Sequence, residues 1–205
     1  MKQALITLVA IMTIATSAIA QKGNVMINGN LGYFAGSEKS GSNTDKHSEF
    51  RFIPGAGYYL SDNFMVGLSI GYYSDVDDPE GKLKTKTNGF MIGPFARYYK
   101  SLGDIFSLYG QFDFLYSSGK TEYINYFGFS DEQKINGCSI SVSPHISANV
   151  GKGFAINFGF GSLGYNSNTT KPDNGDKIKD NTFGLDLNGS TLDWGISYTF
   201  SCANK

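Results

Sequence analysis

Serine and histidine side chains stand at alternate positions in one stretch of this chain, and they are the first candidates for chemistry. His145 lies between Ser143 and Ser147 in the run SISVSPHISA. A hydrolytic triad needs a serine within hydrogen-bond reach of the histidine and an acidic group that orients the imidazole. Serines two positions away along a strand are neighbours on one face and not positioned nucleophiles. We therefore predict no catalytic residues and no enzymatic activity; a lipid-modifying enzyme is the less favoured alternative.

Acidic residues gather in two polar stretches and raise the question of a metal site. The second stretch, KPDNGDKIKD, lacks the twelve-position calcium loop with its closing glutamate. His47 and His145 are not spaced as a metal motif. Solvated loop tips are the preferred interpretation, so we expect no metal and no cofactor. Four carboxylates in the first stretch, SDVDDPEGK, could nevertheless bind a divalent cation: Asp75, Asp77, Asp78 and Glu80.

Other charged residues fall on the polar side of segments that alternate between apolar and polar positions. If such segments close into a barrel, these side chains line its interior, where unpaired charges are costly and must be paired or hydrated. Strand direction places Arg51 and Asp113 toward the loop end of the interior and Arg97 toward the turn end. We predict a polar network that fills and neutralises the lumen, formed by Glu49, Arg51, Arg97, Asp113, His145 and Asp193.

The composition excludes several classes of function. The 205 residues include 17 Lys and Arg against 18 Asp and Glu, which gives no basic surface of the kind that binds nucleic acid. The sequence contains no phosphate-binding loop and no Cys-x-x-Cys motif. Aromatic residues make up 15% of the chain and glycines number 26, a composition that favours an all-β fold.

The first twenty residues are typical of a secretory signal peptide. Lys2 gives a positive start, an apolar run follows, and Ala18-Ile19-Ala20 forms a small-x-small cleavage site. We expect cleavage between Ala20 and Gln21, which divides the chain into a signal peptide (1–20) and a mature domain (21–205). An uncleaved anchor is the alternative, but the apolar run is short for a spanning helix. The residue directly after the cleavage site is Gln21 and not a cysteine, which argues against a lipoprotein.

Eight segments alternate with period two, the spacing of a strand whose two faces differ. In the eighth, the parity of the apolar residues changes, and a bulge near Asn188-Gly189-Ser190 would explain the change. Pro54 and Pro94 lack a donor for the ladder, and bulges would accommodate them too. The predicted strands span about 24–35, 48–60, 64–74, 88–99, 105–117, 134–149, 154–165 and 182–200.

The connections between these segments alternate in length. Residues 61–63, 100–104 and 150–153 are short, whereas residues 36–47, 75–87, 118–133 and 166–181 are long and polar. An even number of strands with short turns at one end and long loops at the other is typical of a bacterial outer-membrane barrel. Cys138 and Cys202 fall far apart in this topology, so we expect no disulfide between them. The mature chain has no apolar run of about 18 residues, so we expect no transmembrane helix.

The apolar face of these strands must meet either lipid or a protein core. A soluble ligand-binding barrel would turn it inward, whereas a membrane barrel turns it outward. The polar face is rich in Gly and Ser, which suits a narrow interior, and most Lys residues lie in the loops. We therefore predict an all-β, eight-stranded antiparallel up-and-down transmembrane β-barrel.

Aromatic residues end the apolar face, where they suit the headgroup level of a bilayer. The last strand closes with the aromatic residue Phe200 almost at the C-terminus. The predicted interfacial girdle consists of Tyr33, Tyr58, Tyr72, Tyr98, Tyr116, Trp194 and Tyr198.

Several of these segments also carry a family resemblance: PGAGYY (54–59), SDN (61–63), VGLSIGY (66–72), GPFARYY (93–99) and the closing segment from Leu192 to Phe200. The chain resembles the small eight-stranded outer-membrane β-barrel domain family of porin-like proteins in Gram-negative bacteria. The resemblance implies residence in the outer membrane, contact with its lipid, and recognition of the C-terminal strand by the outer-membrane assembly machinery. It is specific for architecture and leaves the function open.

Three functions remain in contention. We favour a non-enzymatic structural or surface-interaction role through the long external loops, with a surface ligand or partner. A narrow porin-like channel for small solutes is the alternative, although eight strands leave an interior that side chains nearly fill. A lipid-modifying enzyme or a secreted ligand-binding barrel is less favoured.

Overall fold

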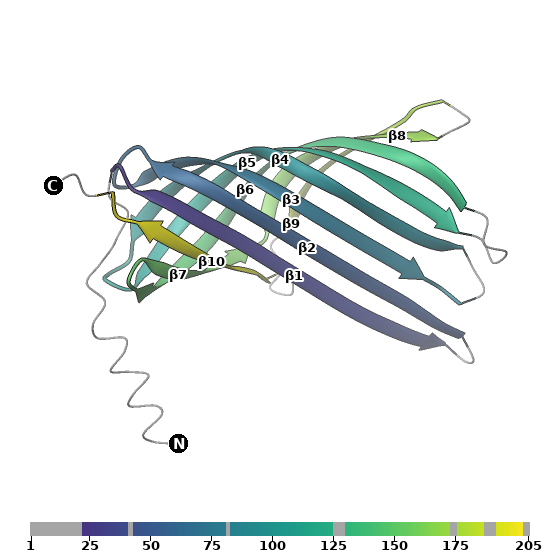
Figure 1. The fold of residues 1–205 in the computed structure, drawn as a ribbon, viewed down its shortest axis with the longest axis horizontal. Helices are drawn as coiled ribbons and strands as arrows, with labels where there is room; N and C mark the ends of the chain where they lie inside the picture. Colours follow the sequence, from purple (N-terminus) through teal and green to yellow (C-terminus); the bar gives the residue numbers. More distant parts are fainter. Residues whose placement is uncertain are drawn as a thin grey trace, which may run out of the picture.

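Antiparallel pairing between long strands governs the fold (Figure 1). The computed structural model describes residues 22–40, 43–80, 83–124, 130–172, 176–186 and 192–202. The strands are β1 (Val25–Ser40), β2 (Asn43–Tyr59), β3 (Phe64–Asp78), β4 (Lys84–Ser101), β5 (Phe106–Ile124), β6 (Ser130–Gly151), β7 (Phe154–Phe160), β8 (Ser162–Pro172), β9 (Ile178–Asp186) and β10 (Leu192–Phe200).

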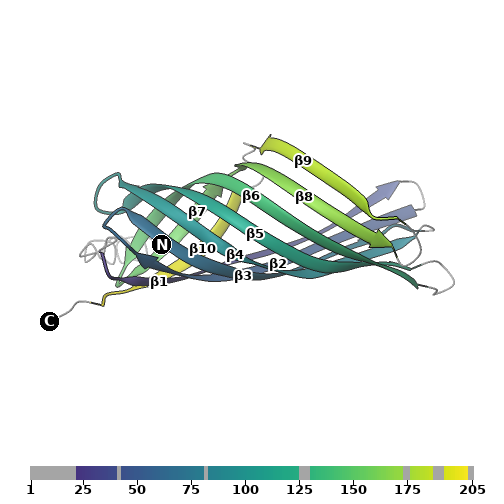
Figure 2. The ribbon, with the colours of Figure 1, turned by 90° about the horizontal axis from the view of Figure 1, so that it is seen from above.

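Each of the first six strands pairs with the next, and the sheet then closes on itself (Figures 1 and 2). β6 pairs with β7 near the short turns and with β8 farther along, while β10 pairs with both β7 and β1. β7 with β8 therefore fills the seventh position of the wall, and β9 with β10 fills the eighth. The result is a closed eight-stranded antiparallel barrel, which confirms the predicted fold class.

The seventh position is interrupted at Gly161, whose φ of 74° is in the left-handed region. Three residues, 160–162, lie opposite the two residues 143 and 144 of β6, so one extra residue forms a bulge. One extra residue turns the following side chains to the other face, which is why the apolar parity changes from Phe158 to Leu163. The bulge predicted at Asn188-Gly189-Ser190 lies outside the described residues.

The seam of the barrel joins the first and last strands. The β1–β10 ladder runs from Val25, opposite Phe200, to Asn30, opposite Gly195. Beyond that level, the described residues of β1 pair with β2, and those of β9 pair with β8. The wall is therefore joined at its seam through the half nearer the short turns.

The prediction of bulges at Pro54 and Pro94 is wrong. The β2–β3 ladder keeps one register from Phe52↔Tyr72 to Gly55↔Ser69, on either side of Pro54. The β4–β5 ladder likewise keeps its register across Pro94. A proline has no N–H to donate, so the ladder misses bonds on one side of the strand while the pairing on the other side continues.

The prediction of long loops at one end of the barrel is also wrong, because most of the residues assigned to these loops continue the strands. β1 and β2 pair as far as Ser40↔Asn43, and β5 and β6 as far as Ile124↔Ser130. A membrane strand needs only about 9–11 residues, whereas β6 has 22. Apolar alternation stops where lipid stops, but backbone pairing does not require apolar side chains. Four paired hairpins thus extend past the apolar band.

The apolar face points outward. Leu68, Ile70 and Phe90 are 53%, 54% and 66% exposed, and they belong to a band that surrounds the barrel. Soluble proteins rarely leave so large an apolar surface in water, so this band meets lipid and the soluble-barrel alternative is excluded. Among the described residues, no helix is long and apolar enough to cross a bilayer. Cys138 and Cys202 are both exposed and free, as expected.

The buried core of the protein lies inside the barrel, near the short turns. Its side chains are aromatic or sulfur-containing and come from five strands: Met26, Tyr59, Met65, Phe95, Tyr99 and Tyr109. The sequence predicts a polar interior rich in Gly and Ser, whereas this part of the interior is aromatic and sulfur-containing. The close packing leaves no room for a side chain at Gly67, where an added Cβ would meet the Phe95 ring and the Ala56 carbonyl oxygen.

We expect Gly67→Ala to lower the free energy of unfolding by about 1–3 kcal/mol, because the added methyl overpacks this interior. The control is Gly110→Ala, since nothing lies within 4 Å of a Cβ added there; its effect should stay within about 0.5 kcal/mol. Urea unfolding of mature protein refolded in detergent measures both values. A difference in gel mobility between unheated and heated samples checks that each variant forms a folded barrel. Equal unfolding midpoints for the two variants would contradict the packing described.

Candidate functional site: a filled lower lumen and a charged rim

Arg97 is the central charge of the lower lumen, the half of the interior nearer the short turns. Its side chain is 4% exposed, and its Nε donates a hydrogen bond of 2.6 Å to Oε1 of Gln111. The guanidinium lies 4.9 Å from the centre of the Phe95 ring and 5.0 Å from that of Tyr109. A cation held between ring faces is stabilised by their negative charge density, more so away from water.

Gln111 links Arg97 to the buried carboxylate of Asp113. Its Nε2 donates to both oxygens of Asp113, at 2.8 and 2.9 Å. An amide can serve both charges at once because it carries an acceptor and two donors. We expected Asp113 to lie toward the loop end with Arg51; instead it lies in the lower lumen with Arg97, because Phe95, two residues before Arg97, is its partner across the ladder.

His145 is also buried in this half. Its Nε2 forms a hydrogen bond of 2.9 Å with Oγ of Ser143, and its ring stacks on Tyr109 with 4.7 Å between centroids. Ser143 and His145 are therefore within hydrogen-bond distance of each other, which their spacing in the sequence did not indicate. Among the described residues, no carboxylate forms a hydrogen bond with His145, so the third member of a triad is not in place.

Little open space remains at this end. A hollow of about 70 Å³ lies among side chains that include Met26, Tyr59 and Tyr99. About 10–15 Å³ of such space is enough to hold one water molecule, so the hollow can hold several. The lower lumen is therefore packed with side chains and does not form a wide aqueous path.

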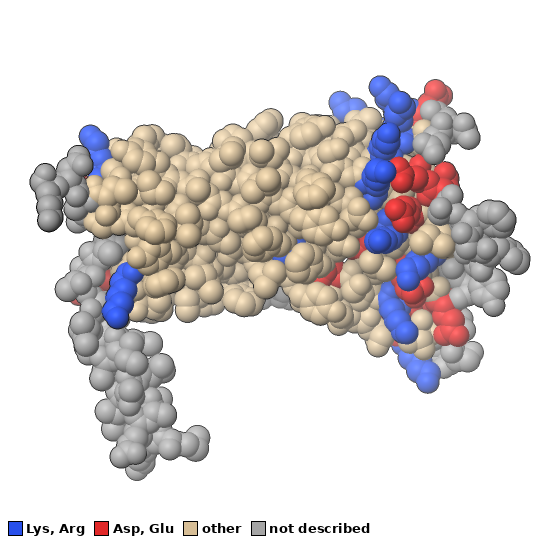
Figure 3. Space-filling view, in the orientation of Figure 1, with Lys and Arg blue, Asp and Glu red and all other residues tan. Residues whose placement is uncertain are grey.

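The rim, which is formed by the four hairpin extensions at the other end of the barrel, carries most of its positive and negative side chains on opposite faces. Lys side chains gather along the border of the uncharged band, with Asp and Glu beyond them (Figure 3). Alternation assigns one set to each face of the hairpins. Positions on the outer face carry Lys39, Lys46, Lys84, Lys86, Lys120, Lys134, Lys171 and Lys179, with Asp78, Glu122 and Glu132. Positions on the inner face carry Glu38, Asp45, Glu49, Asp75, Asp77, Asp131 and Asp180, with Arg51.

A histidine joins the inner carboxylates on β2 and β3. His47 lies directly opposite Asp77 in the ladder. Its Nδ1 is 2.6 Å from Oδ1 of Asp77 and 3.7 Å from Oδ1 of Asp75. The hydrogen bond to Asp77 raises the pKa of His47, and the carboxylates of Asp75 and Glu49 add to this effect. The pKa of Asp75 is raised first by burial and then by Asp77 and Glu49.

The residues predicted to form one network fall into separate groups. Glu49 and Arg51 form an ion pair with each other near the rim, apart from the group of Arg97, Asp113 and His145. The backbone of Asp193 pairs with Gly159, but its side chain lies outside the described part of the structure.

The residues predicted to form the girdle all occupy outward positions on their strands. Trp194 lies opposite Phe158, and Phe200 opposite Val25. An interfacial role for the girdle stays a prediction. Three of its residues lie toward the short turns and three toward the rim: Tyr58, Tyr98 and Tyr198 in the first set, and Tyr33, Tyr72 and Tyr116 in the second.

Sequence reasoning missed the bridging role of Gln111 between Arg97 and Asp113 and the grouping of His47 with Asp75 and Asp77. Gln111 shares the inward parity of Asp113, which is the signal that could have found it. The sequence pattern places His47 in a long connection, where it has no predicted register against β3; the structure pairs it with Asp77.

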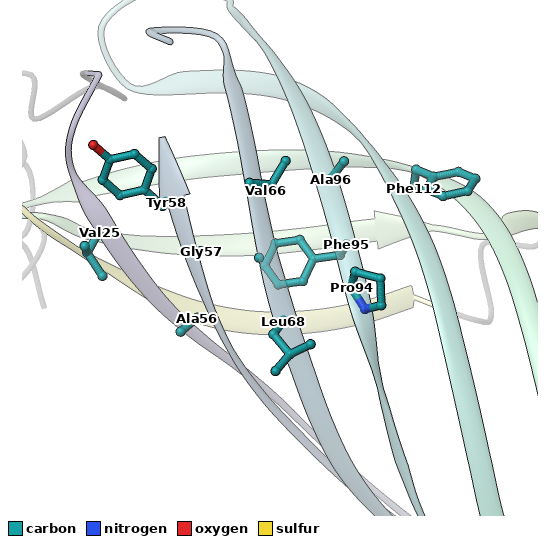
Figure 4. A pocket seen from close by; sticks show the side chains of 11 residues that line it. Val25, Ala56, Gly57, Tyr58, Val66, Leu68, Pro94, Phe95, Ala96 and Phe112 are labelled. Carbon is teal, nitrogen blue, oxygen red and sulfur yellow. The ribbon is translucent and has the colours of Figure 1, made fainter. Parts of the chain in front are cut away.

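A shallow groove on the outer wall has a different chemistry. It crosses β2, β3 and β4 over a floor that includes Ala56, Gly67 and Ala96, beside Tyr58 and Phe112 (Figure 4). Its volume is about 720 Å³, and its lining is almost entirely apolar. Since it opens onto the lipid-facing surface, it suits acyl chains better than a polar solute.

We expect Gln111→Leu to lower the free energy of unfolding by roughly 2–4 kcal/mol, because it leaves a buried guanidinium and a buried carboxylate without their shared partner. Gln133→Leu is the matched control. Gln133 lies on the rim opposite Pro172, and its loss should cost less than about 0.5 kcal/mol. Urea unfolding in detergent measures both. A similar cost for the two substitutions would show that Gln111 does not join the charges.

We expect the pKa of His47 in metal-free protein to exceed the usual 6.5, and Asp77→Asn to bring it back toward that value. A raised pKa in the folded state means that the protonated imidazole stabilises the rim. This stabilisation is full below the unfolded pKa of about 6.5 and is lost as pH rises through the folded pKa. NMR titration of the imidazole measures the shift. In the control Asp78→Asn, which removes an outer-face carboxylate, an equal fall would refute the assignment to Asp77.

Comparison with known proteins gives the fold a family. The structure is similar to Ail, the attachment invasion locus protein of Yersinia pestis, with 14% identity, 88% of this chain and 100% of that chain covered, and a TM-score of 0.49. It is also similar to the translocator domain of the autotransporter NalP from Neisseria meningitidis, with 15% identity, 97% and 95% covered, and a TM-score of 0.49. A major outer membrane protein from Thermus thermophilus has 12% identity, 87% and 99% covered, and a TM-score of 0.47.

No curated protein matches the chain. The family profile of the outer membrane protein beta-barrel domain, however, matches residues 4–190, which is most of the sequence. Together with the outward apolar band, this match places the protein in the outer membrane. The chain belongs to the outer membrane protein beta-barrel domain family.

Proposed function

We propose that this protein is a non-enzymatic binding module of the outer membrane, whose ligand contacts the four hairpin extensions. The observation that carries the proposal is the position of its charge. Charged side chains concentrate on the hairpins beyond the apolar band (Figure 3), while the lumen at the opposite end is filled.

The hairpins are suited to binding because they are paired along their length. The ladder between β3 and β4 continues to Asp77↔Thr85, and that between β8 and β9 to Thr170↔Ile178. A paired hairpin loses less conformational freedom on binding than a free loop of the same length, so less of the interaction energy is spent on ordering.

The inner face of the rim favours ligands that carry positive charge. Its carboxylates outnumber its single guanidinium, Arg51, which is already paired with Glu49. Outward lysines lie closer to the bilayer, where the phosphates of lipid headgroups supply the opposite charge. The ligand class supported best is therefore a basic segment of a partner protein at the cell surface.

The route to the membrane belongs to the same proposal. Cleavage after Ala20 would leave Gln21 close to the start of β1 at Val25, so the mature chain would begin at the periplasmic end. Phe200 ends β10 at the same end, where the assembly machinery would meet it.

Removing the extensions tests the proposal. Residues 36–47, 75–87, 119–135 and 168–180 are replaced by two-residue Asn-Gly turns, which join positions that are already paired, such as Ala35↔Ser48 and Ser74↔Asn88. We expect full-length protein in nanodiscs to bind a lysine-rich peptide in a salt-dependent manner and the shortened barrel to lose this binding. Neither protein should bind a glutamate-rich peptide.

The control keeps the hairpins and carries Asp62→Asn and Asp104→Asn at the short-turn end. It should bind the lysine-rich peptide as the wild type does. Equal binding by the shortened barrel, with its heat-dependent gel shift retained, would refute the proposal. Planar-bilayer recording tests the channel alternative: we expect no conductance steps, and reproducible steps would favour the channel.

A further inference from the structure

We propose that His47, Asp75 and Asp77 form a binding site for a divalent transition-metal ion of the Zn²⁺ type on the inner face of the rim. The site shares inner-face carboxylates with the proposed function but does not depend on it. One ligand atom from each side chain lies within 4.8 Å of the others. The three residues come from two neighbouring strands, β2 and β3, whose register is fixed by their ladder.

The register explains why these side chains converge. His47 and Asp77 are directly opposite each other, and Asp75 is two residues from Asp77 on the same face. Directly opposite residues have Cβ atoms about 4.5–5.5 Å apart. Ligand atoms in a tetrahedral zinc site are about 3.3 Å apart, given bond lengths of about 2.0–2.2 Å. Rotation of side chains can close the remaining difference without moving the backbone.

In the part of the chain that the structure describes, no lysine or arginine forms an ion pair with Asp75 or Asp77. Among the described residues, the ion pairs of Asp75 and Asp77 are with His47. On the neighbouring strands the same face carries uncharged residues: Phe34 and Gly36 on β1, and Thr85 and Thr87 on β4. Arg51 on β2 acts on Asp75 electrostatically, but its ion pair is with Glu49. Two carboxylates close together repel each other, and a dication between them would remove this repulsion.

Other carboxylates nearby are already engaged, which defines the limits of the site. Glu49 is opposite Asp75 but pairs with Arg51. Asp78 pairs with Lys84 at 2.9 Å, and Glu80 accepts a hydrogen bond of 2.7 Å from the backbone N–H of Thr44. Of the four acidic residues that the sequence suggested for a cation, the structure therefore selects Asp75 and Asp77 and adds an imidazole.

The imidazole decides the class of metal. Ca²⁺ and Mg²⁺ prefer oxygen ligands, whereas Zn²⁺ and its neighbours in the first transition series accept one nitrogen with carboxylates. Three protein ligands leave at least one position for water or for a group from another molecule.

The experiment uses mature full-length protein refolded in detergent and prepared without a histidine tag. Isothermal titration with Zn²⁺ alone at neutral pH measures stoichiometry and affinity. We expect one site per chain. His47→Gln and Asp77→Asn should each weaken binding by about tenfold or more, since even the loss of an outer-sphere contact costs about 10–100-fold at metal sites. The matched control Asp78→Asn should bind as the wild type does.

A second measurement does not depend on heats of binding. Co²⁺ replaces Zn²⁺, and its visible absorption should show a nitrogen-containing site in the wild type and in Asp78→Asn but not in His47→Gln. A heat-dependent gel shift in each variant shows that the barrel is folded. Absence of Zn²⁺ binding by the folded wild type, equal binding by wild type and His47→Gln, or equal displacement by Ca²⁺ would each overturn the proposal.

Discussion

Satisfaction of backbone hydrogen bonds in the absence of water is the constraint on which the rest of this structure depends. In the bilayer core, a strand with an unpaired edge leaves N–H and C=O groups without partners, at a cost of several kcal/mol for each group. Here the wall closes through β1 and β10. Closure of eight strands then fixes a narrow interior, which side chains can fill. The filled lumen and the outward apolar band both follow from this one requirement.

In this barrel the apolar face points outward to lipid and polar residues point inward, the reverse of a soluble protein. The protein nevertheless has a packed core. The only surface that excludes both water and lipid is the inside of the barrel, and there Met26, Met65 and Phe95 pack together. Arg97 can share this space because aromatic rings and Gln111 replace its water. A solute that entered the lower lumen would therefore have to displace both the charge and its partners.

The sequence predicted what depends on period two and missed what depends on register. Alternation along VGLSIGY was enough to predict a membrane barrel, because it records which residues face lipid. It did not show where strands end at the rim, since pairing continues there without apolar side chains. It also did not show that Gln111 joins Arg97 to Asp113, because one partner of each such contact lies on another strand. The bulge predicted at Pro54 is absent for a related reason. A missing N–H donor weakens one side of a ladder but does not shift its register.

The alternation of side chains between two faces continues from the membrane-spanning wall into the rim. Within the bilayer, alternation separates apolar from polar residues; beyond it, the same alternation separates lysines from carboxylates. Most charged positions on the outer face carry lysines, whereas most charged positions on the inner face carry carboxylates. The inner face therefore carries repulsion between carboxylates, as Asp75 shows: Asp77 and Glu49 both raise its pKa. Two neighbouring aspartates with one imidazole and no lysine gain more from a bound cation than from water alone. The features that favour a ligand at this rim thus arise from the same strand geometry that closes the barrel.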